Sequence, residues 1–256
     1  MKLAVVGNPV EHSKSPLIFK YLFETLKLKA SYDKIPLQSA NEIPILFKKG
    51  ISGINITAPF KQDVFPFIDK LSEEAREIGS VNTVVLKDGL LIGYNTDYLG
   101  VINSLEERIC DLSSKYCLVL GAGGAARAAI YGLKQRDAVV QLYNRSQYKS
   151  KELAAKFDVD YIDEYHLRKA VENADIIVDT LPADIQLLNP DCLHSGLTVL
   201  DASYPRSVYE KSNCVQLIKG ENWLLHQALP AFQLFTGIKI KKQDYDQQAL
   251  LALLAK

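Results

Sequence analysis

The feature that most constrains the fold is a glycine-rich turn between a predicted strand and a predicted helix. The apolar run 117–120 leads into Gly121-Ala122-Gly123-Gly124-Ala125-Ala126, and an alanine-rich stretch follows. Glycines at such a turn allow a tight bend and let the backbone approach a dinucleotide pyrophosphate at the helix N-terminus. The motif predicts a Rossmann-type domain, although a glycine triplet alone is a weak signal that needs supporting context.

The end of the following strand supplies that context. In a dinucleotide-binding fold the strand about 20 residues further on ends at the adenosine ribose, where an acidic residue favours NAD and an arginine accommodates the 2′-phosphate of NADP. Here the strand at 139–143 ends in Asn144-Arg145-Ser146, and Lys149 follows one turn later. We expect Arg145 and Lys149 to clamp a phosphate, and therefore expect NADP. The alternative is a turn that only packs helix on strand, with Arg145 as a solvated surface charge.

Strands and helices alternate along most of the chain. Apolar runs predict strands at residues 3–6, 31–37, 53–56, 117–120, 139–143, 176–179 and 198–201. Helices are predicted between them, including 16–26, with Ser15 as N-cap and Pro16 at the first helical position, and 64–78. A hairpin through Asp88-Gly89 joins 81–87 to 90–93. This order predicts an α/β fold with mainly parallel sheets, divided into residues 1–98 and 99–222.

The composition excludes several classes of protein. Hydrophobic residues make up 48% and charged residues 23%, as in ordinary globular proteins. Lys+Arg and Asp+Glu number 30 each, so no net field favours nucleic acid or an anionic membrane. The most apolar long stretch, 116–133, contains Arg127 and several glycines, whereas a membrane-spanning helix needs about 20 apolar residues.

The N-terminus and the cysteines suggest a location. The apolar stretch at the N-terminus is too short for a signal peptide, so we expect a cytoplasmic protein. The sequence has four cysteines, Cys110, Cys117, Cys192 and Cys214. Their spacing is typical neither of a metal site nor of a set of disulfides. We expect reduced thiols and no metal site.

Polar residues gather where predicted strands end or helices begin. The clusters are Ser13-x-Ser15, Asn55-x-Thr57-x-x-x-Lys61, Asn82-Thr83 and Asn95-Thr96-Asp97. Because the carboxyl ends of parallel strands line a ligand crevice, these side chains are expected to converge. The mixture suits a polyhydroxylated, anionic small molecule, with Ser13 and Ser15 at a helix N-terminus as the carboxylate binders. Taken singly, each serine is equally well explained as a cap or turn residue.

Lys61 is the one strongly basic residue of these clusters, and Asp97 is the one strongly acidic residue. Reduction of a ketone needs a proton at oxygen as hydride reaches carbon, so we predict that Lys61 and Asp97 form the catalytic dyad. The alternatives are a surface lysine at a helix start and an acid that caps a helix after the hairpin.

The motifs also resemble those of a known family. They are Gly7-x-Pro9-x-x-His12-Ser13-x-Ser15-Pro16, Gly53-x-Asn55-Ile56-Thr57-x-Pro59-x-Lys61, Ile78-Gly79-Ser80-Val81-Asn82-Thr83, Gly93-x-Asn95-Thr96-Asp97-x-x-Gly100, the glycine turn with Arg127, Asn144-Arg145-Ser146, and Gly220-x-x-x-Leu224-x-x-Gln227-Ala228. In order and spacing they resemble the NADP-dependent shikimate dehydrogenases across nearly the whole chain. The resemblance implies reversible, NADPH-dependent reduction of 3-dehydroshikimate to shikimate, a step of aromatic amino-acid (chorismate) biosynthesis.

The resemblance also implies roles for individual residues. It implies that helices at 223–256 complete the substrate domain and that a cleft separates this domain from the NADP-binding domain. The residues implied to bind substrate are Ser13, Ser15, Thr57, Lys61, Asn82, Asp97, Tyr204 and Gln227. Those implied to bind the cofactor are Gly121, Ala122, Gly123, Gly124, Ala125, Asn144, Arg145, Ser146, Lys149, Ala202 and Gly220. Lys61 is the implied proton-transfer residue.

Three positions depart from the family pattern. Phe19-Lys20 stands where the family has His-Asn, Asp179-Thr180-Leu181-Pro182 replaces the usual Asn-Ala-Thr-Ser, and Trp223 replaces Met. These changes bear mainly on cofactor affinity and domain closure.

The open alternatives are a paralogue acting on quinate or aminoshikimate, and a non-catalytic NADP-binding regulatory protein. The partner expected is a small-molecule substrate, and the protein is expected to be a monomer or homodimer.

Overall fold

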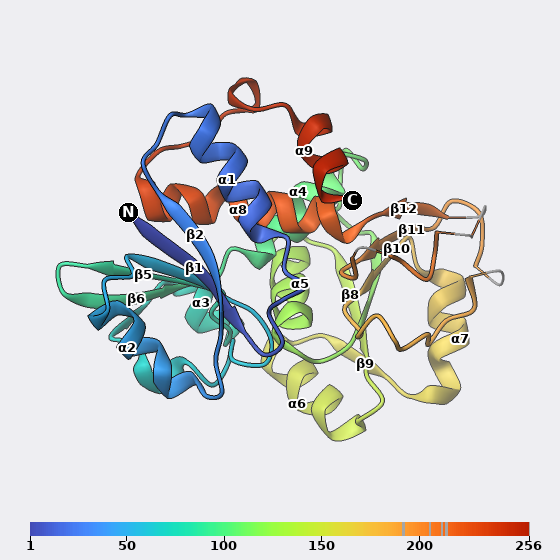
Figure 1. The fold of residues 1–256 in the computed structure, drawn as a ribbon. Coiled ribbons are helices and arrows are strands. Elements are labelled where there is room, and N and C mark those ends of the chain that lie inside the picture. Colours follow the sequence, from blue (N-terminus) through green and yellow to red (C-terminus); the bar gives the residue numbers. More distant parts are fainter. Residues whose placement is uncertain (191–192, 205, 211, 213–214, 256) are drawn as a thin grey trace. The chain divides into compact units, whose positions relative to one another are not determined.

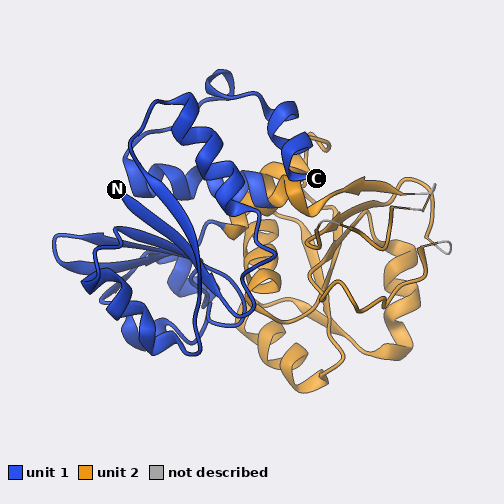
Figure 2. Ribbon diagram, viewed as in Figure 1, with its two compact units in different colours: residues 1–96, 224–256 blue, residues 97–223 orange. Residues whose placement is uncertain are grey.

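The computed structural model divides into two compact units (Figures 1 and 2). It describes residues 1–190, 193–204, 206–210, 212 and 215–255. Unit 1 comprises Met1–Thr96 and Leu224–Lys256, and unit 2 comprises Asp97–Trp223. Asp97 is therefore the first residue of unit 2.

Unit 1 contains a six-stranded, mainly parallel sheet. The strands are β1 (Lys2–Gly7), β2 (Ser31–Pro36), β3 (Gly53–Ile56), β4 (Lys70–Leu71), β5 (Thr83–Lys87) and β6 (Leu90–Tyr94). Their order is β2-β1-β3-β5-β6-β4, with β1, β2 and β3 parallel and β5 antiparallel to both neighbours. The predicted hairpin is confirmed, because β5 and β6 pair through Asp88 and Gly89, whose φ angles are 52° and 78°.

Helices cover both faces of this sheet. They are α1 (Ser15–Thr25), η1 (Ala40–Glu42), α2 (Ile43–Lys48), η2 (Phe65–Phe67), α3 (Glu73–Ile78), α8 (Gly220–Thr236), η4 (Lys242–Asp244) and α9 (Gln247–Leu254). Leu3 and Val5 of β1 face α1, α8 and α9, whereas Ala4 and Val6 face the cluster that includes α2. Since side chains alternate along a strand, this buried strand supports a core on each side. Figure 1 shows α1, α8 and α9 grouped beside β1.

Two helix predictions for unit 1 were wrong in detail. The stretch 64–78 is not one helix, because Pro66 lies in the short η2 and α3 starts only after Ser72, whose hydroxyl accepts a hydrogen bond from the Ala75 amide at 3.2 Å. Ser15 is not the N-cap of α1. It is the first helical residue, Lys14 occupies the N-cap position, and Pro16 follows within the first turn, where proline needs no hydrogen-bond partner.

Unit 2 contains a parallel six-stranded sheet. Its strands are β7 (Tyr116–Leu120), β8 (Val139–Tyr143), β9 (Asp160–Ile162), β10 (Ile176–Asp179), β11 (Thr198–Asp201) and β12 (Gln216–Ile218). The order β12-β11-β10-β7-β8-β9 is that of a doubly wound dinucleotide-binding sheet, read from the opposite edge. The predicted α/β class and Rossmann-type unit are thus confirmed. The edge strands β9 and β12 were missed, because three residues are too short for a clear pattern.

Helices cover the second sheet as well. The helices are α4 (Asp97–Glu106), α5 (Gly124–Lys134), α6 (Gln147–Phe157) and α7 (Glu164–Asn173). One core cluster packs Val119 and Val178 against α4, α5 and α6, and another packs Leu118 and Ile177 with α7. The two faces of each central strand are therefore both buried, as parallel sheets require.

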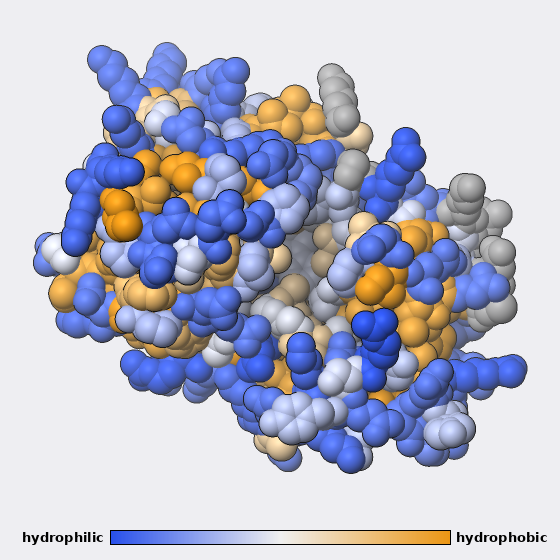
Figure 3. Space-filling model, turned by 60° about the horizontal axis from the view of Figure 1, so that its bottom comes forward, coloured by the Kyte–Doolittle hydropathy of each residue, from blue (hydrophilic) through white to orange (hydrophobic). Residues whose placement is uncertain are grey.

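On the face drawn in Figure 3, hydrophilic residues cover most of the surface, and hydrophobic residues form small groups between them. Among the described residues, no helix combines the length and apolar character needed to cross a membrane. Cys110 is exposed and Cys117 buried, both as free thiols. Cys192 and Cys214 lie outside the described residues.

Trp223 packs tightly against the start of α4. Its indole Nε1 donates to the backbone carbonyl of Asp97 at 3.0 Å. A Cβ atom on Gly100 would lie 2.4 Å from Trp223 Cδ1 and 2.9 Å from its backbone oxygen. Gly100 therefore leaves room for the indole, and the indole in turn fixes the first residue of α4.

We expect Gly100→Ala to destabilise unit 2 by about 1–3 kcal/mol, because the added methyl overpacks against the indole. The sign of the change in unfolding free energy is informative, since alanine in a helix is otherwise about 1 kcal/mol more favourable than glycine. Urea unfolding of the wild type and the variant measures the change. In a Trp223→Met background the cost should shrink by at least about 0.5 kcal/mol. A stabilising Gly100→Ala would show that the contact is loose.

Candidate active site

The loops that follow β1 and β3 lie together at one edge of the unit 1 sheet. The amide of Thr57 donates to the Val6 carbonyl at 2.8 Å, and the amide of Asn8 donates to the Ala58 carbonyl at 3.0 Å. A Cβ on Gly7 would lie 2.3 Å from Thr57 Cγ2, so the two loops approach as closely as glycine permits. Thr57 of the second polar cluster therefore lies against the start of the loop after β1, as the parallel pairing predicts.

Ser13 and Ser15 form a buried pair at the N-terminus of α1. They are 5% and 4% exposed, and their hydroxyl oxygens lie 3.3 Å apart. The N-cap residue Lys14 makes no side-chain cap, and the Ser13 hydroxyl accepts a hydrogen bond from the Ser15 amide at 3.4 Å. Two hydroxyl donors beside the positive end of an 11-residue helix form a suitable environment for a carboxylate.

Lys61 lies in the irregular turns after β3, not at a helix start. It is partly buried, and its backbone carbonyl accepts a hydrogen bond from the Val81 amide at 2.8 Å. Lys61 is thereby held next in space to the segment that carries Asn82. Asp97 is 5% exposed and opens α4 of unit 2. The pairing of Lys61 with Asp97 stays a prediction.

Gln227 of α8 lies against Asn82, although 145 residues separate them. Asn82 Nδ2 donates to Gln227 Oε1 at 3.2 Å, and the two residues are 2% and 7% exposed. Thr96 joins them, since Asn82 Nδ2 also donates to its hydroxyl at 2.9 Å. Two predicted substrate-binding amides are thus brought together within unit 1. Reasoning from the residues alone missed Thr96 as their partner.

The glycine turn of unit 2 lies at the point where the strand order reverses, between β7 and β10. Gly121 has φ 108°, and a Cβ there would lie 2.4 Å from Thr180 Oγ1. Gly123 is the N-cap of α5, and a Cβ on it would meet no atom within 4 Å. The helix N-terminus therefore faces open space at the crevice where doubly wound sheets bind phosphates.

Arg145 lines a cavity of about 430 Å³ at the end of β8. An apolar wall comes from the segment after β10, and a polar wall from the ends of β8 and β9. The lining residues are Tyr143, Asn144, Arg145, Gln147, Ile162, Asp163, Glu164, Leu181, Pro182, Ile185 and Leu187. An apolar wall opposite an arginine suits a flat heterocycle carrying a phosphate. Ser146 and Lys149 are exposed nearby in sequence but do not line the cavity.

Ala202 and Gly220 approach each other through their backbones. A Cβ on Gly220 would lie 2.7 Å from the carbonyl oxygen of Ala202 and 2.6 Å from that of Ser203. These two positions, 18 residues apart in sequence, therefore meet beyond the ends of β11 and β12. Tyr204 follows Ala202 by two residues in the sequence and is partly buried.

A cluster of side chains suited to a metal ion is absent from the described part of the chain.

Asp179 is a buried acid at the end of β10. It is 4% exposed and accepts hydrogen bonds from Tyr209 Oη at 2.6 Å and from the Leu181 amide at 2.9 Å. Its register partner in β11 is Asp201, also buried. Burial raises the pKa of Asp179 to about 6, the Tyr209 and Leu181 hydrogen bonds oppose this rise, and the charge of Asp201 adds to it.

We expect Asp179→Asn to remove a pH dependence of stability. The folded pKa lies above the ordinary 3.8, so the stabilisation from the protonated form is complete only below pH 3.8 and is lost as pH rises through about 6. Two pKa units correspond to about 3 kcal/mol as an upper figure. Unfolding of wild type and variant between pH 4 and 8 should show the variant gaining relative stability up to pH 6. The exposed Asp184→Asn is the control, and parallel profiles for wild type and Asp179→Asn would contradict the effect.

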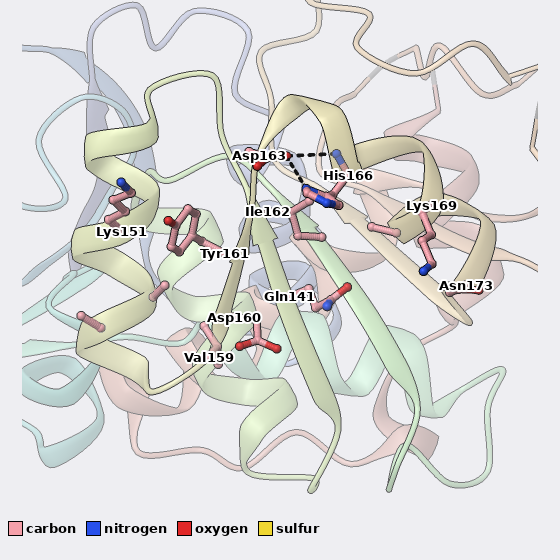
Figure 4. A pocket seen from close by; sticks show the side chains of 13 residues that line it. Gln141, Lys151, Val159, Asp160, Tyr161, Ile162, Asp163, His166, Lys169 and Asn173 are labelled. Carbon is pink, nitrogen blue, oxygen red and sulfur yellow. Dashed lines mark hydrogen bonds and ion pairs between the residues drawn. The ribbon is translucent and has the colours of Figure 1, made fainter.

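A larger groove lies along the outer edge of the unit 2 sheet and shares Ile162 and Asp163 with the cavity beside Arg145. Figure 4 shows the side chains that line it, among them Asp160, Tyr161 and Ile162 of β9. Its volume is about 690 Å³. Lys151 of α6 lies 5.5 Å from the Tyr161 ring centroid, and His166 Nδ1 lies 2.7 Å from Asp163 Oδ1. This groove contains none of the predicted site residues, and its mixed charges indicate no particular ligand.

Two family models match most of the chain. The model described as shikimate dehydrogenase substrate binding domain matches residues 5–84. The model described as shikimate / quinate 5-dehydrogenase matches residues 104–220. The matches fall on unit 1 and unit 2 respectively.

Individual relatives agree with these matches. The chain is 34% identical over 248 residues to a shikimate dehydrogenase (NADP(+)) of Aquifex aeolicus, covering 92% of this chain and 91% of that protein. The structure resembles shikimate 5-dehydrogenase of Thermus thermophilus in complex with NADP(H) and shikimate, with a TM-score of 0.87, 27% identity and 99% of each chain covered. It also resembles quinate dehydrogenase of Corynebacterium glutamicum in complex with NAD, with a TM-score of 0.86, 25% identity, and 98% and 97% of the chains covered.

Proposed function

Because the chain belongs to the shikimate dehydrogenase family, we propose that it reduces 3-dehydroshikimate reversibly to shikimate with NADPH. The observation that carries the proposal is the meeting of Asn82 and Gln227 at the sheet edge that also presents Thr57. A ring with several hydroxyls needs such fixed polar partners. The reaction belongs to aromatic amino-acid biosynthesis.

The substrate is assigned to the polar edge of unit 1. The buried Ser13 and Ser15 hydroxyls bind its carboxylate at the N-terminus of α1, where the helix dipole favours negative charge. Thr57, Asn82 and Gln227 bind hydroxyls. From unit 2, Asp97 and Tyr204 are assigned to the substrate on the family pattern.

Lys61 is assigned as the proton-transfer residue. In the reduction, hydride adds to the carbonyl carbon, the C=O π electrons move to oxygen, and the Lys61 ammonium donates a proton to that oxygen. In the reverse direction the neutral amine accepts the proton as the hydroxyl is oxidised. Asp97 is the second residue of the proposed dyad.

NADP is assigned to unit 2, where it supplies or accepts the hydride. The residues assigned to the pyrophosphate are Gly121, Ala122, Gly123, Gly124 and Ala125. Asn144, Arg145, Ser146 and Lys149 are assigned to the adenosine 2′-phosphate, and Ala202 and Gly220 to the nicotinamide. The open N-terminus of α5 and the cavity beside Arg145 support this assignment. Asn144 stands where an NAD-binding strand carries an acid, which favours NADP.

Other outcomes stay open to experiment. A quinate or aminoshikimate dehydrogenase would use the same carboxylate and ring sites. A non-catalytic NADP-binding regulator would not need Lys61 and Asp97, both of which the chain retains. A cytoplasmic location, the absence of nucleic-acid partners, and a monomeric or homodimeric state remain predictions.

We expect Lys61→Ala to lower kcat by roughly 10²–10⁴-fold, the usual contribution of a general acid or base, with a smaller change in KM for shikimate. Steady-state oxidation of shikimate by NADP⁺ measures both constants. Lys87→Ala, at an exposed position on β5, is the matched control and should keep the wild-type rate. An unchanged kcat in folded Lys61→Ala would remove Lys61 from the proton-transfer role.

A further inference from the structure

A chain of hydrogen bonds runs through the interior of unit 1 to Asn82 and Gln227. Tyr32 Oη donates to Asn55 Oδ1 at 2.7 Å. Asn55 Nδ2 donates to Thr83 Oγ1 at 2.9 Å. Thr83 Oγ1 in turn donates to Asn82 Oδ1 at 2.9 Å. Thr83 and Asn55 are 0% and 6% exposed. The chain therefore lies out of solvent, where a lost partner is not replaced by water.

Backbone groups fix the orientation of each amide in this chain. The Thr96 amide can only donate, and it lies 2.8 Å from one atom of the Asn82 side chain, which must be the oxygen. The Leu224 carbonyl can only accept, so the Gln227 atom at 2.9 Å from it must be the nitrogen. In the same way the Asn82 carbonyl, 3.2 Å from Asn55, identifies the Asn55 nitrogen. The polarity of all three amides thus follows from the fold.

The direction of the remaining bonds follows from these fixed ends. Since the Asn55 nitrogen faces Thr83, the Thr83 hydroxyl must accept from it and use its own proton on Asn82 Oδ1. That oxygen then accepts from both Thr83 and the Thr96 amide, which holds the Asn82 nitrogen toward Gln227 Oε1. Gln227 has a second Nε2 proton besides the one given to Leu224. Every donor points the same way, from Tyr32 toward Gln227.

We propose that Thr83 is a positioning residue for substrate, because its hydroxyl links Tyr32 and Asn55 to Asn82. Asn82 in turn donates to Gln227 Oε1, which holds the second Nε2 N–H of Gln227 toward a substrate oxygen. This inference rests on the proposed function, which assigns the two amides to substrate hydroxyls. Thr83 is not itself placed against the substrate. Its side chain acts through Asn82. At the other end of the series of hydrogen bonds, the Tyr32 ring is stacked on Phe19 with centroids 4.0 Å apart, which fixes the position of Tyr32.

The test compares Thr83→Val with Thr83→Ser. Valine keeps the shape and removes the hydroxyl, leaving Asn55 Nδ2 and Asn82 Oδ1 each without one partner. Serine restores the hydroxyl. We expect Thr83→Val to raise KM for shikimate about 10-fold, with a smaller fall in kcat and no change in KM for NADP⁺, the size expected for one lost buried hydrogen bond. Thr83→Ser should stay within about 2-fold of the wild type.

A matched control separates positioning from loss of stability. Thr198 in β11 is 4% exposed, and its hydroxyl donates to Gln216 Oε1 at 3.3 Å, outside the chain of hydrogen bonds. Thr198→Val should leave KM for shikimate unchanged. If Thr83→Val lowers only the melting temperature and shifts no KM, the hydroxyl has a structural role alone and the inference is overturned.

A second readout needs no turnover. The side-chain amide signals of Gln227, assigned by their loss in Gln227→Ala, should move in ¹⁵N–¹H spectra of Thr83→Val and stay in place in Thr83→Ser and Thr198→Val. Failure of the wild type to oxidise shikimate would count against the proposed function, while these spectra would still decide whether Thr83 orients Gln227. Unchanged Gln227 signals in Thr83→Val would overturn the inference even in an active enzyme.

Discussion

The parallel pairing of strands is the constraint on which the sites depend. Neighbouring parallel strands end at the same edge of a sheet, so the segments that follow them meet there. In unit 1 this pairing brings Thr57 against Gly7 after β3 and β1. In unit 2 it brings Thr180 against Gly121 after β10 and β7. Both contacts are closer than a Cβ atom would allow, which is why glycine occupies each turn.

Burial of polar groups gives the two edges different properties. In unit 1 the buried amides of Asn55, Asn82 and Gln227 each contact backbone groups of fixed polarity, so the interior sets which end of each amide donates. In unit 2 the buried Asp179 lies beside Asp201, and desolvation exceeds the effect of its two hydrogen bonds on its pKa. One edge is thus a fixed hydrogen-bonding surface, and the other contains a carboxyl whose pKa burial raises to about 6.

The sequence predicted the elements whose signals are local. The glycine turn, the Asp88-Gly89 hairpin and the central strands of both sheets depend on short patterns, and the structure has them. The helix expected over 64–78 failed because Pro66 and Ser72 impose a break that the apolar spacing does not reveal. Ser15 was misplaced as N-cap by one residue, within the usual uncertainty of helix ends.

Contacts over long sequence separation were harder to predict. Motif resemblance named Asn82 and Gln227, but nothing in the residues indicated that their side chains hydrogen-bond to each other. Tyr32 lies in a strand and belongs to no motif, and Thr83 was noted only as part of the Asn82-Thr83 cluster. Their place in the series of hydrogen bonds appears only in three dimensions.

The most direct measurement of the central claim is the absorbance change when the purified protein is mixed with NADP⁺ or NAD⁺ and with shikimate or quinate. We expect shikimate to reduce NADP⁺, and we expect far slower rates with quinate or with NAD⁺. Preference for quinate or NAD⁺ would assign the chain to a paralogue, and no reduction in any combination would contradict the catalytic role itself.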